Sequence, residues 1–74
     1  MDLYAASPRP VRLTPREREI LAFLTTEGLS NKVIASRMHV AENTVKAFVH
    51  ELCLKYHVHN RLQLALAYLK EGIN

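Results

Sequence analysis

The side chains best suited to chemistry lie in one stretch near the middle of the chain, AENTVKAFVHELCLKYHVHN, residues 41–60. Asparagine, lysine and histidine can hydrogen-bond to the edges of DNA bases, whereas histidine and cysteine can bind a metal such as zinc. The stretch is therefore a candidate for a nucleic-acid surface or for a metal site. A third interpretation is that it only packs against the remainder of the protein.

The metal interpretation depends on His50, Cys53 and His57. On a helix these three positions fall within about 60° of arc, so they could approach one ion. Structural zinc usually takes four ligands from more than one element, however, and the cysteine pairs that frame such sites are missing from a chain with one cysteine. His59 would have to swing round from the following turn to be a fourth ligand. We therefore expect neither a metal nor another cofactor.

Size and composition indicate one small globular domain. The chain has 74 residues, of which 49% are hydrophobic and 23% are charged, a balance typical of globular proteins. It has no apolar run near the roughly 18–20 residues that cross a bilayer, and no signal peptide, so we expect a cytoplasmic protein without membrane contact. A nucleophile–base pair, a phosphate-binding loop and a carboxylate dyad are all lacking. We therefore do not expect an enzyme.

The distribution of charge indicates a polyanionic partner. The net charge is only +3, but between Ser30 and Arg61 five lysines and arginines stand against two glutamates. All four histidines lie in the same segment, and a neighbouring polyanion favours the charged form of histidine. An ordinary solvated surface could carry the same charge, so charge alone does not decide the matter.

The start of the chain differs from the rest. Two prolines, Pro8 and Pro10, disfavour a helix there. We interpret residues 1–12 as a flexible lead-in or linker and residues 13–74 as the domain. No strand-like alternation of apolar and polar residues competes with the helical patterns of this domain, so the expected fold class is all-α.

Capping residues mark the first helix. Thr14 is a good N-cap, Pro15 suits the first helical position, and Glu17 completes a capping box. Gly28 ends this helix. The residues expected to face inward are Ile20, Leu21, Phe23 and Leu24.

A short helix, a tight connection and a longer helix follow, which is the pattern of a helix-turn-helix. Ser30 caps the short helix, which runs to about Met38. Residues 38–40 form the connection, and the longer helix covers about Glu42–Tyr56. The residues that the short helix is expected to bury are Val33 or Ile34, Ala35 and Met38.

The longer helix divides into two faces. At 100° per residue, one set of apolar residues falls within about 100° of arc and forms a core stripe. A separate flank carries Asn43, Lys46 and His50 in the N-terminal half, which is the half that reaches base edges in the major groove. Lysine can donate to guanine, histidine to a base or a phosphate, and the methyl group of Ala47 can contact a thymine methyl. A solvated surface helix would show the same division. The core stripe consists of Val45, Phe48, Val49, Leu52 and Tyr56.

A fourth helix begins at Asn60, a strong N-cap with Gln63 at the capping-box position, and is expected to end at Gly72. Its apolar residues exceed what one inward face requires. The residues expected to face inward are Leu62, Ala65, Leu66 and Leu69. The residues expected on another side, in a two-fold dimer contact, are Leu64, Ala67 and Tyr68. The alternative is that Leu64 and Tyr68 pack on the first helix within the monomer.

Several strings closely resemble the LuxR-type (GerE-like) DNA-binding domain of bacterial transcription regulators. They are LTPRERE at 13–19, GLSNK at 28–32 followed by Ile34-Ala35, NTVK at 43–46, and Lys55 with Val58. Region four of sigma factors has a similar topology, but LTPRERE and TVK favour the LuxR type. The resemblance spans about residues 13–69. It implies a four-helix helix-turn-helix domain with a tri-helical core, whose third helix enters the major groove and whose fourth helix forms a dimer.

The resemblance also implies site residues. The family's base-contacting positions fall on Lys46, Ala47 and His50, to which the helical flank adds Asn43. Glu17 and Glu19 are expected to cap and brace the scaffold. The phosphate-holding positions fall on or near Asn31, Lys32, Thr44, Lys55 and Arg61, although the cations among them could serve only solubility.

The chain departs from the family pattern at several positions. Ala41 stands where serine or threonine usually caps the third helix, and the loss of that oxygen costs about 0.5–2 kcal/mol. Phe48 replaces a common histidine and Tyr56 a usual leucine, and both are expected to enlarge the core. Glycine is frequent at the positions of His39 and His57, so His39 is expected to adopt a left-handed conformation.

We therefore predict a sequence-specific DNA-binding transcriptional regulator, or the DNA-binding domain of one. Its partner is double-stranded DNA, which it binds as a homodimer, and RNA polymerase is a candidate further partner. The alternative is a protein-interaction module that pairs with a full-length regulator of the same family and silences it. Ala41, Ala47 and Phe48 keep this alternative open, because they make the third helix less polar than is usual.

Overall fold

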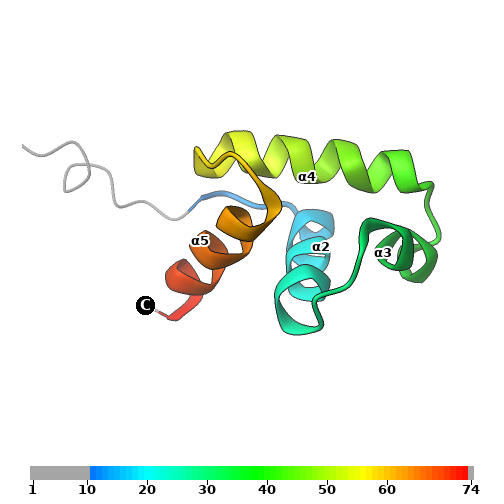
Figure 1. The fold of residues 1–74 in the computed structure, drawn as a ribbon, viewed down its shortest axis with the longest axis horizontal. Coiled ribbons are helices and arrows are strands. Elements are labelled where there is room, and N and C mark those ends of the chain that lie inside the picture. The colour runs from blue at the N-terminus through cyan, green and yellow to red at the C-terminus, as the bar shows by residue number, and fades with distance from the viewer. Residues whose placement is uncertain (1–10, 74) are drawn as a thin grey trace, which may run out of the picture.

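The computed structural model describes residues 11–73 and builds that part of the chain from four helices without a strand. They are α2 (Pro15–Thr26), α3 (Asn31–Met38), α4 (Glu42–Tyr56) and α5 (Arg61–Ile73), shown in Figure 1. The predicted all-α fold is confirmed. Apart from Val11 and Arg12, the predicted lead-in lies outside the described residues.

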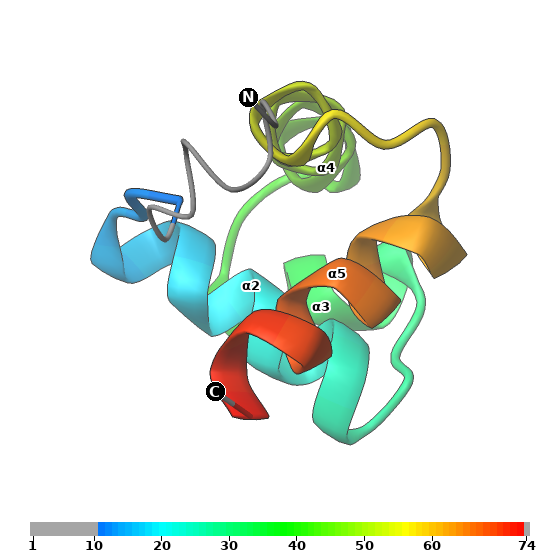
Figure 2. The same cartoon turned by 90° about the vertical axis from the view of Figure 1, so that its left-hand side faces the viewer.

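The four helices form a scaffold with one long helix laid across it. In Figure 1, α4 runs along the top of the molecule, with α5, α2 and α3 beneath it. Figure 2 looks nearly along α4 and shows the other three helices gathered on one side of it. α4 contacts each of the three. One side of α4 is therefore packed, and the opposite side faces away from the scaffold.

Local capping explains where α2 and α3 begin. The Thr14 hydroxyl accepts a hydrogen bond from the N–H of Glu17 at 3.1 Å, and the Glu17 carboxylate accepts one from the N–H of Thr14 at 2.9 Å, which confirms the predicted capping box. Ser30 Oγ accepts the N–H of Val33 at 3.3 Å at the start of α3. α4 begins after Ala41, whose side chain makes no capping hydrogen bond. α4 thus lacks about 0.5–2 kcal/mol that serine or threonine would supply.

Left-handed residues end α3 and α4. His39 has φ 60° and ψ 43°, and His57 has φ 57° and ψ 43°. The conformation of His39 is the one that the sequence predicts. Glycine adopts this conformation readily, whereas a β-carbon makes it unfavourable. Gly28, which follows α2, also has a positive φ of 63°.

A single core joins all four helices. The predicted inward faces of α2 and α4 are confirmed at their central positions, and Ile34 rather than Val33 faces inward on α3, since Val33 is 40% exposed. Phe23, Phe48 and Tyr56 pack at the margin of the core, partly buried. The buried residues of the core are Ile20, Leu21, Leu24, Ile34, Ala35, Met38, Val45, Leu52 and Leu64.

The predicted inward face of α5 is wrong for three of its four residues, whereas Ala65 does pack against the core. Leu62 and Leu66 are 68% and 57% exposed, and Leu69 is exposed as well, although all three were expected to face inward. Leu64 is fully buried instead. α5 carries apolar residues around most of its circumference, so helical periodicity alone does not select a face. Packing against α2 and α4 selects it.

The residues predicted for the dimer contact are turned toward the protein. Leu64 is unavailable to a partner, because it lies in the core of the monomer. Ala67 is partly buried, and Tyr68 packs, partly buried, against the core. The packing of Leu64 and Tyr68 within the monomer is therefore the arrangement found.

The ends of α5 agree only in part with the prediction. Asn60 Oδ1 accepts the N–H of Gln63 at 2.8 Å, which confirms the N-cap. The Gln63 side chain accepts the N–H of His59 at 2.7 Å, one residue earlier than a capping box requires. The helix continues through Gly72 to Ile73 instead of ending there, at the modest cost of about 1 kcal/mol that an interior glycine carries.

Candidate nucleic-acid interface

The four predicted base-contacting residues lie together on the exposed side of α4. Asn43, Lys46, Ala47 and His50 are all exposed, and their positions span about 100° of helical arc, roughly opposite the buried residues of the same helix. Leu54 continues this side in the C-terminal half and is 62% exposed. The exposed side thus combines hydrogen-bonding groups at one end with an apolar group toward the other.

A shallow hollow of about 260 Å³, which no sequence pattern indicates, adjoins these residues. It is lined by Thr44, Ala47, Phe48 and Glu51. Phe48 was expected to enlarge the core, and it does pack against the core while also forming one wall of this hollow. Ala47 belongs both to the hollow and to the predicted base-contacting set. The hollow is therefore continuous with the candidate interface.

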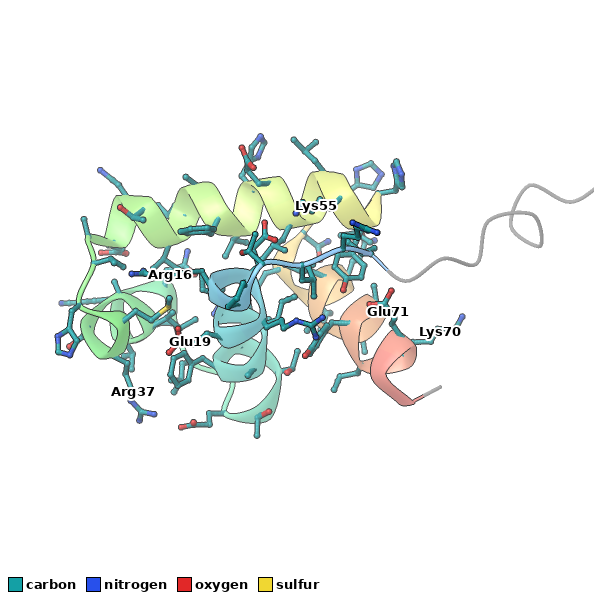
Figure 3. The ribbon with its side chains drawn as sticks, turned by 180° about the vertical axis from the view of Figure 1, so that it is seen from behind. Arg16, Glu19, Arg37, Lys55, Lys70 and Glu71 are labelled. Carbon is teal, nitrogen blue, oxygen red and sulfur yellow. The ribbon has the colours of Figure 1, made fainter. Side chains whose placement is uncertain are left out.

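Lys55 has a partner inside the protein. Its Nζ donates to Glu17 Oε1 at 2.8 Å and to the carbonyl oxygen of Arg12 at 3.1 Å. Figure 3 shows Lys55 on the side of α4 that faces the start of α2. The ion pair joins the last turn of α4 to the first turn of α2, so a phosphate would have to compete with Glu17 for this cation. Residues 38 positions apart in sequence make this contact, which is why local patterns did not reveal it.

The Glu17 carboxylate is the centre of this contact. It is 4% exposed, and burial raises the pKa of its carboxyl group. The hydrogen bond from Lys55, the backbone hydrogen bond from Thr14 and the charge of Lys55 lower the pKa by more, so the pKa lies below its ordinary value. The predicted capping and bracing role of Glu17 is confirmed by this geometry.

Arg61 and Asn31, both predicted to hold phosphates, bind each other. The Arg61 guanidinium donates to Asn31 Oδ1 and to the carbonyl oxygen of Leu29. This contact ties the start of α5 to the start of α3. Lys32, the next residue of α3, is exposed and stays available to solvent.

Arg37 lies outside the candidate interface. It pairs with Glu27 at 3.0 Å and lies over the ring of Phe23, 5.7 Å from the ring centroid. Figure 3 shows it on the side of the molecule away from α4. Its positive charge therefore serves the packing of α3 on α2.

Comparison with protein families decides the family of this chain. The model of the family described as bacterial regulatory proteins, luxR family, matches residues 11–68. The chain belongs to the luxR family. The resemblance noted in the sequence is thereby confirmed.

Several curated relatives of this luxR-family chain are bacterial regulators. It is 45% identical over 56 residues to the two-component response regulator PprB of Pseudomonas aeruginosa, a match that covers 76% of this chain and 20% of PprB. It is 42% identical over 62 residues to the nitrate/nitrite response regulator NarL of Escherichia coli, covering 84% of this chain and 28% of NarL. It is 48% identical over 54 residues to the DNA-binding transcriptional activator DevR/DosR of Mycobacterium tuberculosis, covering 73% and 24%.

These matches concern a part of each relative, since the chain spans 28% or less of the length of these three proteins. No solved structure matches the luxR-family chain significantly. Within residues 11–73, none of the helices has the length and apolar character needed to span a membrane.

The histidines and the cysteine of α4 do not converge on an ion site. Within the part of the chain that the structure describes, no three histidine, cysteine or acidic side chains are grouped so as to hold a metal. Cys53 is partly buried beside the core, and burial raises the pKa of its thiol. His50 and His57 are exposed.

Tyr56 holds the C-terminal end of α4 in place. It stands where the resemblance to LuxR-type domains leads one to expect leucine. Tyr56 donates its hydroxyl hydrogen to Glu71 Oε1 at 2.8 Å, and the N–H of Val11 donates to Glu71 Oε2 at 2.8 Å. Burial and the hydrogen bond to Glu71 raise the pKa of the Tyr56 hydroxyl far above its ordinary value. One carboxylate thus joins α4, α5 and the segment before α2.

Proposed function

We propose that this chain is a sequence-specific DNA-binding domain of a bacterial transcription regulator and that it inserts α4 into the major groove. The observation that carries the proposal is the exposed side of α4, where Asn43, Lys46, Ala47 and His50 stand together on a helix whose other side is packed on the scaffold. An α-helix fits the major groove. The luxR family match and the relative described as a DNA-binding transcriptional activator support the same function.

The base-contacting residues divide by chemistry. Lys46 donates to the O6 and N7 acceptors of guanine, and Asn43 is suited to adenine. His50 donates to a base edge or to a phosphate. The methyl group of Ala47 contacts a thymine methyl at the rim of the hollow.

Phosphate contacts come from the start of α3 and of α4. Lys32 is exposed in the first turn of α3, where free backbone N–H groups and the helix dipole also favour an anion. Thr44 is exposed in the first turn of α4. The remaining predicted phosphate residues contribute chiefly by bracing the scaffold. Asn31 and Arg61 tie the start of α3 to the start of α5, and Lys55 ties the last turn of α4 to the first turn of α2.

Assembly on DNA uses α5, with its face reassigned. Leu62, Leu66 and Leu69 form an exposed apolar strip at spacings of four and three residues, which places them on one side of the helix. We propose this strip as the two-fold contact of a homodimer. Such a dimer presents two copies of α4 to half-sites about one turn of DNA apart. RNA polymerase remains a candidate partner of the assembled regulator.

The experiment that tests DNA binding is a titration of the chain with duplexes selected from a random pool, repeated at several salt concentrations. Phosphate contacts release counterions, so the logarithm of the binding constant should fall linearly with the logarithm of salt concentration, by about 0.9 for each phosphate contacted. A selected duplex should bind more tightly than a scrambled duplex of equal length. A chain that shows no salt dependence and no preference between the two duplexes is not a DNA-binding domain.

The second candidate function is a module that pairs with a full-length regulator of the family and silences it. Two observations favour it: α4 starts at the uncapped Ala41, and the apolar strip of α5 is exposed. Co-sedimentation with a full-length LuxR-type regulator, combined with the absence of binding to any duplex, would support this function over the first.

A further inference from the structure

Two histidines occupy a backbone conformation that favours glycine. His39 and His57 have φ of 60° and 57°, and both are exposed. A side chain is unfavourable in this region, and glycine is not. Neither histidine therefore stabilises the fold better than glycine would. A non-glycine residue in this conformation at an exposed position is a reason to look for a role in binding.

The two histidines differ in their relation to α4. His57 follows the last turn of α4, and in projection along the helix its position lies within about 20° of both Lys46 and His50. His39 ends α3 and does not belong to α4. Only His57 is therefore aligned with the candidate base-contacting residues.

The length of α4 places His57 near a DNA strand. α4 has 15 residues, which corresponds to about 22 Å, whereas the major groove is about 12 Å wide. When residues 43–50 lie in the groove and α4 crosses it, the C-terminal end of the helix comes near a sugar–phosphate backbone. His57, the C-cap residue, stands at that end on the same flank as Lys46 and His50.

We propose that His57 is a phosphate-binding residue and that its proton makes DNA binding stronger at lower pH. This inference rests on the proposed function. Histidine gains its charge between about pH 5 and pH 8, and a phosphate nearby favours the charged form. His50, on the same flank, adds a second proton-dependent contact closer to the bases.

The surroundings leave both imidazoles available to DNA. Within residues 11–73, the hydrogen bonds and ion pairs include none to either side chain. The acidic side chains that contact α4 from its neighbours are Glu17 of α2 and Glu71 of α5, and each is bound to a donor on α4. Glu51 of α4 lines the hollow. The charged residues of α3 are the cations Lys32 and Arg37.

The test compares three variants of the whole chain, each bound to the duplex that the wild type selects from a random pool, at about pH 6 and about pH 8. His57→Gly removes the imidazole. His57→Asn keeps a side chain that tolerates the left-handed conformation but cannot become charged. His39→Gly is the matched control, because it makes the same backbone change at the end of another helix. The first and third variants should keep or raise Tm, so a loss of binding cannot be a loss of fold.

Both His57 variants should bind at least about tenfold more weakly than wild type near pH 6, the size of one charge-assisted contact. Their salt slope should fall by about 0.9, the difference should shrink near pH 8, and His39→Gly should bind like wild type. Equal binding by wild type and His57→Asn at both pH values overturns the inference, and so does an equal loss in His39→Gly. A wild-type chain without salt-dependent duplex binding overturns the proposed function instead.

Discussion

Replacing Leu64 by alanine tests how α5 sits on the protein. Leu64 is 0% exposed in the core, so the substitution removes buried carbon atoms and leaves a cavity, which lowers the free energy of unfolding by about 2.7–5 kcal/mol. At 0.05–0.15 kcal/mol per residue, a domain of this size has a total stability of about 4–11 kcal/mol. The substitution should therefore remove about a quarter or more of the total stability. Leu66→Ala is the matched control: Leu66 is 57% exposed on the same helix, and its loss should change stability by only about 0.5–1 kcal/mol.

The assay is urea denaturation followed by circular dichroism. If Leu64→Ala does not fold, Leu64→Met keeps the side-chain volume and should lose less than about 1.5 kcal/mol, which allows its oligomeric state on DNA to be compared with that of Leu66→Ala. Leu66→Ala should weaken the dimer and leave the monomer intact, whereas Leu64→Met should leave the dimer intact. A larger loss of stability in Leu66→Ala than in Leu64→Ala would refute the packing described for α5.

Three further predictions concern α4 and its brace. Ala41→Ser should supply the missing N-cap and raise the free energy of unfolding by about 0.5–2 kcal/mol, seen as a higher urea midpoint; an unchanged midpoint would contradict the capping argument. The folded-state pKa of Glu17 lies below its ordinary value of 4.5. The Glu17–Lys55 contact therefore stabilises the fold above about pH 4.5, and this contribution is lost as pH falls through the folded-state pKa. When stability is measured across an acid titration, Glu17→Gln should lack that pH dependence. Lys46→Ala should cost about 1–3 kcal/mol of base discrimination, whereas Lys32→Ala should weaken all sequences alike and reduce the salt slope by about 1; equal effects on selected and scrambled duplexes would contradict this division.

The beginnings of the helices could be predicted from the sequence because they depend on neighbouring residues. Thr14 with Glu17, Ser30 and Asn60 each bond to backbone groups within three residues, so the signal and the structure it determines lie together. The left-handed turn at His39 was expected instead from the resemblance to LuxR-type domains, in which glycine is frequent at this position.

The orientation of α5 and the long-range braces could not be predicted in this way. Seven apolar residues lie between positions 62 and 69, on both the exposed and the buried sides of α5, and a period of 3.6 then fits more than one face. The pairs Lys55–Glu17 and Arg61–Asn31 join positions 38 and 30 residues apart. The residues next to Lys55 and Arg61 in the sequence do not distinguish these cations from ones that bind phosphate. Only the tertiary packing brings Glu17 and Asn31 within hydrogen-bonding distance of them.

The hydrogen bond between Val11 and Glu71 fixes where the backbone enters the domain. Glu71 also accepts a hydrogen bond from Tyr56, the last residue of α4. The entry point therefore lies by the C-terminal end of α4, and the N-terminal half of this helix is the part that is proposed to contact bases. Figure 1 shows the segment before α2 passing under the C-terminal end of α4. The backbone at Val11 therefore lies away from the half of α4 that is proposed to contact bases.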